Sequence, residues 1–264
     1  MNNYYALLMA GGIGERFKPL STPDFPKQFH DLLGKGRSLL QISYDRFSKI
    51  VDADRILIAT NERYQPLVNN QISGIKKEQI LLETAKRNTA PCILYAALKI
   101  FQRDPDGILF VSPTDHFINN ELEFKQNLLQ AAQFCTTNDA LVTLGIAANE
   151  PNTEYGYINF VQSENAVKQV IQFVEKPSKS RAIEFLKDGG YLWNSGLFIF
   201  GVRNILNAFR EHQAVLFEAF NVDMNFWDQK AEGLFLKSKY PMAENMSIDY
   251  AIMEKASNVA VLPA

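Results

Sequence analysis

Residues 5–28 have the sequence YALLMAGGIGERFKPLSTPDFPKQ. The apolar run 5–9 predicts a buried strand that breaks directly into a loop of small residues. Those residues are Ala10, Gly11, Gly12 and Gly14. Such a loop presents backbone N–H groups to an anion, because glycine has no Cβ to block the approach. Arg16 and Lys27 add mobile positive charge, so the stretch predicts a triphosphate site.

The loop differs from two well-known phosphate loops. A G-x-G-x-x-G pattern that began at Gly12 would need glycine where the chain has Phe17, and no G-x-x-x-x-G-K-[ST] run exists. The stretch instead resembles the signature G-G-x-G-x-R-x-x-P-L…P-K of the sugar-phosphate nucleotidyltransferases. Gln28, directly after Pro26 and Lys27, narrows the resemblance to the mannose-1-phosphate guanylyltransferases.

Composition limits the class of protein. The chain has 264 residues, of which 47% are hydrophobic and 21% charged, as expected of an ordered globular domain. A net charge of −2 argues against a nucleic-acid or membrane partner, and no apolar stretch approaches the length of a membrane span. Two distant cysteines, Cys92 and Cys135, and the lack of a signal peptide indicate a cytoplasmic protein.

Hydrophobic patterning predicts an α/β, Rossmann-like fold. Strands are expected at 55–59, 79–82, 107–111, 140–146, 157–161, 166–175 and 193–200. Helices are expected at 39–49, after Asn61, after Asn88 or Thr89, and at 121–134, 178–187, 202–220, 228–237 and 247–256. This alternation favours a mixed, mostly parallel sheet flanked by helices, with ligands at the carboxyl ends of the strands. We expect one domain, 1–264, with a nucleotide-binding half, 1–150, and a sugar-phosphate-binding half, 151–264.

The segment 83–91, E-T-A-K-R-N-T-A-P, lies between a predicted strand and a helix. The Glu83 carboxylate could accept the N1–H and N2–H₂ donors of guanine, while Asn88 and Thr89 could contact the base or ribose. Helix capping alone would also explain Asn88 or Thr89. The segment resembles E-x-x-x-R-N-T-A-P of the guanylyltransferases, which implies that it contacts the nucleotide.

Asp115 follows a predicted buried strand in the run V-S-P-T-D-H. Mg²⁺ prefers oxygen ligands and often takes one or two carboxylates plus phosphate and water, so Asp115 is the candidate metal ligand. A turn-capping role is the alternative for Asp115. The run resembles the P-x-D-H motif of the family, which implies the metal role. His116 is interpreted as a packing or supporting residue rather than a base.

The second half carries the motifs expected to bind a sugar phosphate. Gly156 lets the backbone approach a sugar closely, Glu175 could accept sugar hydroxyls, and Lys176 could hold a phosphate. These residues, with Tyr155, could equally form a strand-end turn and a surface ion pair, and Asn194 could belong to a tight turn beside a core aromatic residue. They resemble the family motifs Y-G-Y-I, F-x-E-K-P and W-N-S-G-[LIM]-F. Asp249, in S-I-D-Y, is as well explained by capping.

The resemblance covers residues 5 to about 255 and implies a reaction. GMP would pass from GTP to mannose 1-phosphate, giving GDP-mannose and pyrophosphate by Mg²⁺-assisted in-line displacement. Arg16 and Lys27 would stabilise the triphosphate and the developing charge, so alanine at either should cut turnover with the fold intact. Another nucleotide or hexose 1-phosphate, or a non-catalytic GDP-sugar-binding subunit, remains open, as does a homodimer.

One departure from the family concerns the C-terminus. Residues 258–264 have the pattern of a strand that has only begun. The family continues into a W-x-D-x-G segment whose aspartate is a second Mg²⁺ ligand, and this sequence stops before it. We therefore expect a fragment truncated at its C-terminus.

Overall fold

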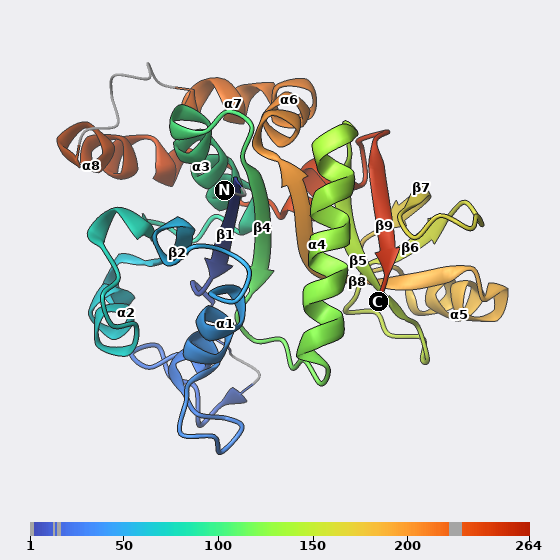
Figure 1. The fold of residues 1–264 in the computed structure, drawn as a ribbon, viewed down its shortest axis with the longest axis horizontal. Coiled ribbons are helices and arrows are strands. Elements are labelled where there is room, and N and C mark those ends of the chain that lie inside the picture. Colours follow the sequence, from blue (N-terminus) through green and yellow to red (C-terminus); the bar gives the residue numbers. More distant parts are fainter. Residues whose placement is uncertain (1–2, 13, 15–16, 222–228) are drawn as a thin grey trace.

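The computed structural model describes residues 3–12, 14, 17–221 and 229–264. Its centre is a nine-stranded sheet with the strand order β3-β2-β1-β4-β8-β5-β9-β7-β6 (Figure 1). The strands are β1 Tyr4–Met9, β2 Ile56–Asn61, β3 Ile80–Glu83, β4 Ile108–Pro113, β5 Leu141–Ala147, β6 Tyr157–Phe160, β7 Lys168–Val174, β8 Tyr191–Gly201 and β9 Val259–Pro263. Only β7 and β8 run against the common direction, which confirms the predicted mixed, mostly parallel sheet.

Helices cover both faces of the sheet (Figure 1). They are α1 Leu39–Phe47, α2 Gln65–Gln71, α3 Thr89–Arg103, α4 Glu121–Thr137, α5 Lys179–Asp188, α6 Val202–His212, α7 Ala214–Phe220 and α8 Gln229–Ser238. In β1, Leu7 packs in a cluster with α3, α6 and α7, whereas Ala6 and Leu8 pack in a cluster with α1, α2 and α4. A strand buried on both faces needs a continuous apolar run, as residues 5–9 provide.

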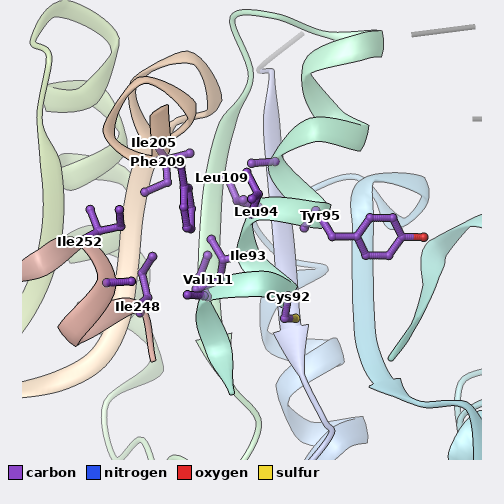
Figure 2. Packing of buried hydrophobic residues seen from close by; sticks show 14 of the residues in the cluster. Cys92, Ile93, Leu94, Tyr95, Leu109, Val111, Ile205, Phe209, Ile248 and Ile252 are labelled. Atoms are coloured by element: carbon purple, nitrogen blue, oxygen red, sulfur yellow. The ribbon is translucent and has the colours of Figure 1, made fainter. Parts of the chain in front are cut away.

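The larger cluster joins the sheet to the layer of α3 and α6. Figure 2 shows Ile93 of α3 beside Val111 of β4, in the same cluster as Phe209 of α6. All three side chains are fully buried. This packing fixes the start of α3, which borders the candidate site described below. In the described part of the chain, no helix has both the length and the apolar composition to cross a bilayer.

Strand β8 joins the second half of the chain to the first. It lies antiparallel between β4 and β5, and its register sets Trp193 opposite Ile146 and Asn194 opposite Gly145. The first residues of β8 therefore reach the edge where β4 and β5 end. The segment predicted as a strand that has only begun is β9, which pairs with β5 on one side and β7 on the other.

Two predicted helices differ from the structure. The helix expected at 202–220 is broken into α6 and α7 at Gln213, whose backbone is not helical (φ −140°, ψ 47°). The Gln213 side chain donates to the Ala251 carbonyl at 3.2 Å, so the break links these helices to an element that follows α8 in the chain. That element, expected as a helix over 247–256, is a π-helical turn, Asp249–Met253.

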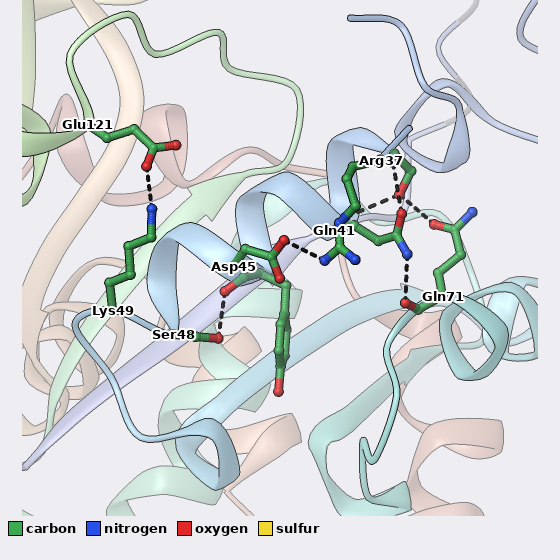
Figure 3. A network of polar contacts seen from close by, with 9 residues as sticks. Arg37, Gln41, Asp45, Ser48, Lys49, Gln71 and Glu121 are labelled. Carbon is green, nitrogen blue, oxygen red and sulfur yellow. Dashed lines mark hydrogen bonds and ion pairs between the residues drawn. The ribbon is translucent and has the colours of Figure 1, made fainter. Parts of the chain in front are cut away.

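A polar network anchors the turn that carries Lys27 (Figure 3). Ser38 caps α1 by accepting from the Gln41 amide at 3.2 Å, and its hydroxyl donates to Gln71 of α2 at 2.6 Å. The Gln71 amide group in turn donates to the Phe29 carbonyl at 2.9 Å. Two helices therefore hold the backbone two residues from Lys27.

Removal of the Phe110 ring from the core should cause a large loss of stability. Phe110 of β4 is fully buried, with its ring centroid 5.5 Å from that of Tyr4 and 6.2 Å from that of Phe47. Phe110→Ala should lower the free energy of unfolding by about 3–5 kcal/mol, because a rigid sheet cannot close the cavity. Urea unfolding followed by circular dichroism measures this. Phe117→Ala, at a side chain 63% exposed, is the control, and an equal loss there would contradict the assignment.

Candidate active site

Three predicted site segments end at the same edge of the sheet. Strands β3, β1 and β4 are parallel, and β1 lies between β2 and β4 in the order of the sheet. The glycine loop follows β1, Glu83 closes β3, and Asp115 follows β4. Carboxyl ends of parallel strands are where α/β proteins bind ligands, and two cavities open along this edge.

The first cavity, of about 340 Å³, lies between the glycine loop and the start of α3. It is lined by Met9, Gly11, Gly12, Glu83, Lys86, Arg87, Asn88, Thr89, Cys92 and Asn245. It therefore gathers five of the seven residues predicted to bind nucleotide. Lys86 and Arg87 were missed although they lie inside the quoted segment 83–91. No sequence motif marks Asn245 as a residue of this cavity, because it lies near the far end of the chain and only the fold brings it here.

Glu83 is the buried acid of this cavity. Burial raises its pKa to about 7, although the hydrogen bond that it accepts from the Tyr240 hydroxyl, at 2.8 Å, opposes the shift. A Cβ on Gly11 would lie 2.5 Å from Glu83 Oε2, so the loop can pass the carboxylate only because residue 11 is glycine. The carboxylate and the glycine loop thus form one wall.

Two other predicted nucleotide residues lie elsewhere. Ala10 is buried, its amide donates to the Ala59 carbonyl, and its own carbonyl accepts from Gln28 at 2.7 Å and Thr60 at 2.9 Å. The prediction that Ala10 contacts nucleotide is corrected on this ground, because both of its backbone groups are used within the protein. Gly14 packs instead on Lys27, as described below.

Asn88 and Thr89 serve the fold as well as lining the cavity. Asn88 has a left-handed backbone (φ 63°) and caps α3 by accepting from the Thr89 amide at 3.0 Å. The Thr89 hydroxyl accepts from the Ile248 amide at 2.8 Å. Asn88 therefore does cap the helix, as the alternative interpretation predicted. Because the cap uses its side-chain oxygen, the side-chain nitrogen could still contact a ligand. Burial raises the pKa of the Cys92 thiol well above its usual value, so this cysteine stays neutral.

Lys27 and Asp115 meet between the glycine loop and β4. The Lys27 Nζ is paired with the Asp115 carboxylate, and the two side chains are 21% and 32% exposed. Burial would raise the pKa of Asp115, but the hydrogen bond and charge of Lys27 outweigh it and hold that pKa below its usual value. Burial lowers the pKa of His116, which favours the packing interpretation of this residue. Arg16 lies outside the described residues.

Asp115 suits a hard cation by its chemistry. Among the described residues no group of three or more His, Cys, Asp and Glu side chains could enclose a metal. Mg²⁺ does not need such a cage, since one carboxylate with phosphate oxygens and water is a common arrangement for it. Asp115 borders the second cavity and is partly exposed, so it could supply that one carboxylate.

The second cavity, of about 440 Å³, lies beyond β4 along the same edge. It is lined by Asp115, His116, Phe117, Ile118, Phe124, Leu144, Ile146, Tyr155, Trp193, Asn194, Ser195, Leu197 and Ala264. The Tyr155 and Trp193 rings lie 5.1 Å apart between centroids. The fold thus brings Tyr155 and Asn194 to the cavity that also contains Asp115, while Gly156, Glu175 and Lys176 lie outside its lining.

The Asn194 side chain is already engaged by the protein. Its oxygen accepts from Thr143 at 2.9 Å and from the Gly196 amide at 3.0 Å, and its nitrogen donates to Asp249 at 2.8 Å. Asn194 could offer a ligand one remaining N–H. Burial raises the pKa of Asp249, and the bond from Asn194 opposes that shift, so Asp249 is a buried partner rather than a simple cap.

Glu175 is a buried acid with unused hydrogen-bonding capacity. Its side chain is 8% exposed, and its Oε2 has no hydrogen-bond partner in the described part of the chain. Burial, followed by the charge of Asp249, raises the pKa of Glu175 to about 7. A Cβ on Gly156 would lie 2.5 Å from this Oε2. Lys176, half exposed with φ 44°, holds its Nζ 3.7 Å from Glu175.

Glu175→Gln should change how stability depends on pH. The pKa of Glu175 rises from an ordinary 4.5 to about 7 on folding, so wild-type stability falls as pH increases through this range. A neutral glutamine removes that loss. The free energy of unfolding of the variant, relative to that of wild type, should therefore increase by about 1–3 kcal/mol as the pH rises from 4.5 to 8. Urea unfolding at a series of pH values measures this difference. Glu184→Gln, at an exposed position, is the control, and a parallel pH profile for both variants would refute the burial argument.

Comparisons with known proteins agree with this geometry. A family model described as nucleotidyl transferase matches residues 5–232. The chain is 35% identical, over 97% of its length, to a mannose-1-phosphate guanylyltransferase of Escherichia coli, and 34% identical to the alginate biosynthesis protein AlgA of Pseudomonas fluorescens. It covers 55% and 54% of those two proteins, so it spans about half the length of the curated relatives it matches.

Solved structures share the fold over almost the whole chain. A Thermus thermophilus protein described as a mannose-1-phosphate geranyltransferase superimposes with a TM-score of 0.87 at 33% identity, covering 99% of this chain and 74% of that one. A mannose-6-phosphate isomerase of Helicobacter pylori gives 0.78 at 28% identity, covering 98% and 96%. The match of the family model over most of the sequence, together with a glycine loop at the carboxyl edge of such a sheet, shows that the chain belongs to the nucleotidyl transferase family.

Proposed function

We propose that this chain transfers GMP from GTP to mannose 1-phosphate, giving GDP-mannose and pyrophosphate. The observation that carries the proposal is the pair of cavities at one sheet edge, together with Asp115, which lines the second cavity and is paired with Lys27. A reaction that joins a nucleotide to a sugar phosphate needs two such pockets, open toward a common centre. The names of several relatives support this choice of substrates.

The first cavity suits a guanine nucleotide. Guanine presents N1–H and N2–H₂ donors on one edge, and Glu83 is a buried carboxylate that can accept them. Gly11 and Gly12 offer backbone N–H groups for the triphosphate beside it. The amide nitrogen of Asn88 and the side chain of Lys86 line the same cavity and could contact the ribose or the phosphates.

The second cavity suits a sugar phosphate. Tyr155 and Trp193 give it an aromatic wall of the kind on which a sugar ring can pack. Glu175 lies outside the lining of this cavity, but its Oε2, without a partner among the described residues, could accept a sugar hydroxyl if the backbone at Gly156 moves slightly to admit it. Lys176 is half exposed and carries a point charge suited to a phosphate.

The chemical step needs little acid–base help. A phosphate oxygen of mannose 1-phosphate attacks the α-phosphorus of GTP, a new P–O bond forms, and the bond to the β-phosphate oxygen breaks to release pyrophosphate. Because the nucleophile is already anionic, catalysis comes from alignment and charge stabilisation. Lys27, and Arg16 by its place in the sequence, would stabilise the charge on the α-phosphate and the leaving group.

Mg²⁺ is the cofactor that this chemistry favours. Asp115 would hold it, and the ion would neutralise charge on the phosphates. The pair of Lys27 and Asp115 shows that a positive group already neutralises this carboxylate. Lys27 would then turn from Asp115 to the phosphates when the cation binds.

Pyrophosphate release over a panel of nucleotides and sugar 1-phosphates tests the proposal. GTP with mannose 1-phosphate should give the highest kcat/KM, and a preference for UTP or dTTP would overturn the guanine assignment. A preference for another hexose 1-phosphate would overturn the sugar assignment alone. Binding of GDP-mannose without turnover at saturating Mg²⁺ would indicate a non-catalytic subunit instead.

A further inference from the structure

The carboxylate of Glu83 has one hydrogen-bond donor in the described part of the chain. Tyr240, in a 3₁₀ turn over Tyr240–Met242, donates its hydroxyl to Glu83 Oε1 at 2.8 Å. Oε2 is the atom nearest the glycine loop, since a Cβ on Gly11 would lie 2.5 Å from it. The two oxygens thus differ: one is tied to Tyr240 and the other faces the loop side of the first cavity.

Tyr240 is itself held rigidly. It is fully buried, and its ring lies 6.4 Å from that of Tyr95 and 5.7 Å from that of Phe220. The Arg87 Nε donates to the Pro241 carbonyl at 2.9 Å. This bond holds the turn in place from the side of the cavity. A side chain packed in this way cannot follow Glu83 if the carboxylate rotates.

A second link joins the same two segments. The Thr84 hydroxyl, next to Glu83 in the chain, donates to the Leu236 carbonyl at the end of α8. The Arg87 carbonyl accepts from the Met246 amide at 3.3 Å, and the Ala90 amide donates to the Met246 carbonyl at 3.1 Å. Hydrogen bonds at Thr84, Arg87 and Ala90 therefore hold the segment from α8 to Met246 against residues 83–91.

From this geometry we propose that Tyr240 is a positioning residue that fixes the Glu83 carboxylate for recognition of the guanine edge. The proposal rests on the proposed function, because it concerns the same base pocket. Each carboxylate oxygen has two lone pairs, so Oε1 can keep the Tyr240 bond while both oxygens accept from N1–H and N2–H₂. The hydroxyl selects one rotamer of Glu83 before nucleotide binds, which lowers the cost of binding.

The hydroxyl also favours the ionised form of Glu83. A hydrogen bond donated to a carboxylate lowers its pKa, and Tyr240 supplies such a bond against the burial that raises the pKa of Glu83. Cys92, which stays neutral, and the cations Lys86 and Arg87 line the same cavity as Glu83. Loss of the hydroxyl should therefore raise the pH at which Glu83 becomes a carboxylate.

The test compares Tyr240→Phe with Tyr95→Phe. The control removes the hydroxyl of the neighbouring, equally buried tyrosine, which donates to Glu232. The measurement is kcat/KM for GTP and for ITP, which lacks the 2-amino group, across pH 6–9 with mannose 1-phosphate saturating. Urea unfolding of both variants records any loss of stability.

Tyr240→Phe should lower kcat/KM for GTP by roughly tenfold at pH 7 and narrow the preference for GTP over ITP. Its pH profile should move to higher pH, while that of Tyr95→Phe stays with wild type. The titration of the nucleotide is common to all three proteins and cancels in the comparison. Tyr240→Phe with an unchanged profile and an unchanged GTP/ITP ratio would overturn the proposal, whatever its stability. If wild type does not favour GTP, the proposed function fails instead.

Discussion

Lys27→Ala should lower kcat by about 10²–10³-fold with the fold intact, because in the proposed reaction it removes the charge that would stabilise the reacting phosphates. The Lys27 Nζ pairs with Asp115, which lines the second cavity, and lies 5.3 Å from the centroid of the Phe17 ring. An interaction made mainly in the transition state should affect kcat and kcat/KM equally. Steady-state kinetics of pyrophosphate release measure both constants.

The matched control is Lys49→Ala. Lys49 also pairs with a carboxylate, Glu121, but on the surface between α1 and α4 (Figure 3). Exposed ion pairs contribute about 0–1 kcal/mol, so this variant should retain wild-type turnover and nearly wild-type stability. Near-normal turnover in Lys27→Ala would remove Lys27 from the catalytic centre, and a matching loss in Lys49→Ala would point to a general effect of charge.

Gly14→Ala is the second substitution expected to have a large effect. Gly14 has φ +68°, and a Cβ there would lie 2.7 Å from Lys27 Cγ and 2.9 Å from Lys27 Cβ. The new methyl group must therefore displace either the lysine side chain or the loop, which would change the position of Lys27 relative to Asp115. Misplacement of a catalytic group by about 1 Å can cost 10²-fold in rate, so we expect kcat to fall between about 10- and 100-fold.

Gly36→Ala separates the two consequences of this change. Gly36 has nearly the same backbone conformation, φ +71°, but a Cβ there would have no heavy atom within 4 Å. Both variants should lose about 1 kcal/mol of stability from the left-handed backbone, and only Gly14→Ala should lose turnover. Equal turnover in the two variants would show that Gly14 does not set the position of Lys27.

Much of the fold follows from local pattern. The apolar run 5–9, the serine cap at Ser38 and the regular spacing of strands predict the parallel sheet and its flanking helices, because each depends on neighbours in the chain. The break of the 202–220 helix could not be predicted this way. It depends on Gln213 reaching Ala251, almost forty residues later, and no local signal announces such a contact.

In the candidate site, too, some residues could be predicted from local motifs and others depend on contacts between distant parts of the chain. Gly11 and Glu83 carry recognisable motifs, and the structure brings them to one cavity. Tyr240 and Asn245 lie about 160 residues away from Glu83 and belong to no quoted motif, so sequence alone could not connect them with the base pocket. Ala10 belonged to the glycine motif, but only the sheet reveals that its backbone is used by Gln28 and Thr60.

If Glu83 in the first cavity contacts GTP and Glu175, outside the lining of the second cavity, contacts the sugar phosphate, each carboxylate should affect the KM of one substrate only. The most direct test is one kinetic matrix, in which wild type, Glu83→Gln and Glu175→Gln are each measured with GTP varied at saturating mannose 1-phosphate, and then with the substrates exchanged. Glu83→Gln should raise the KM for GTP by roughly tenfold and leave the KM for mannose 1-phosphate unchanged. Glu175→Gln should raise the KM for mannose 1-phosphate and leave the KM for GTP unchanged. Two variants that raise the same KM, or that exchange these effects, would contradict the account.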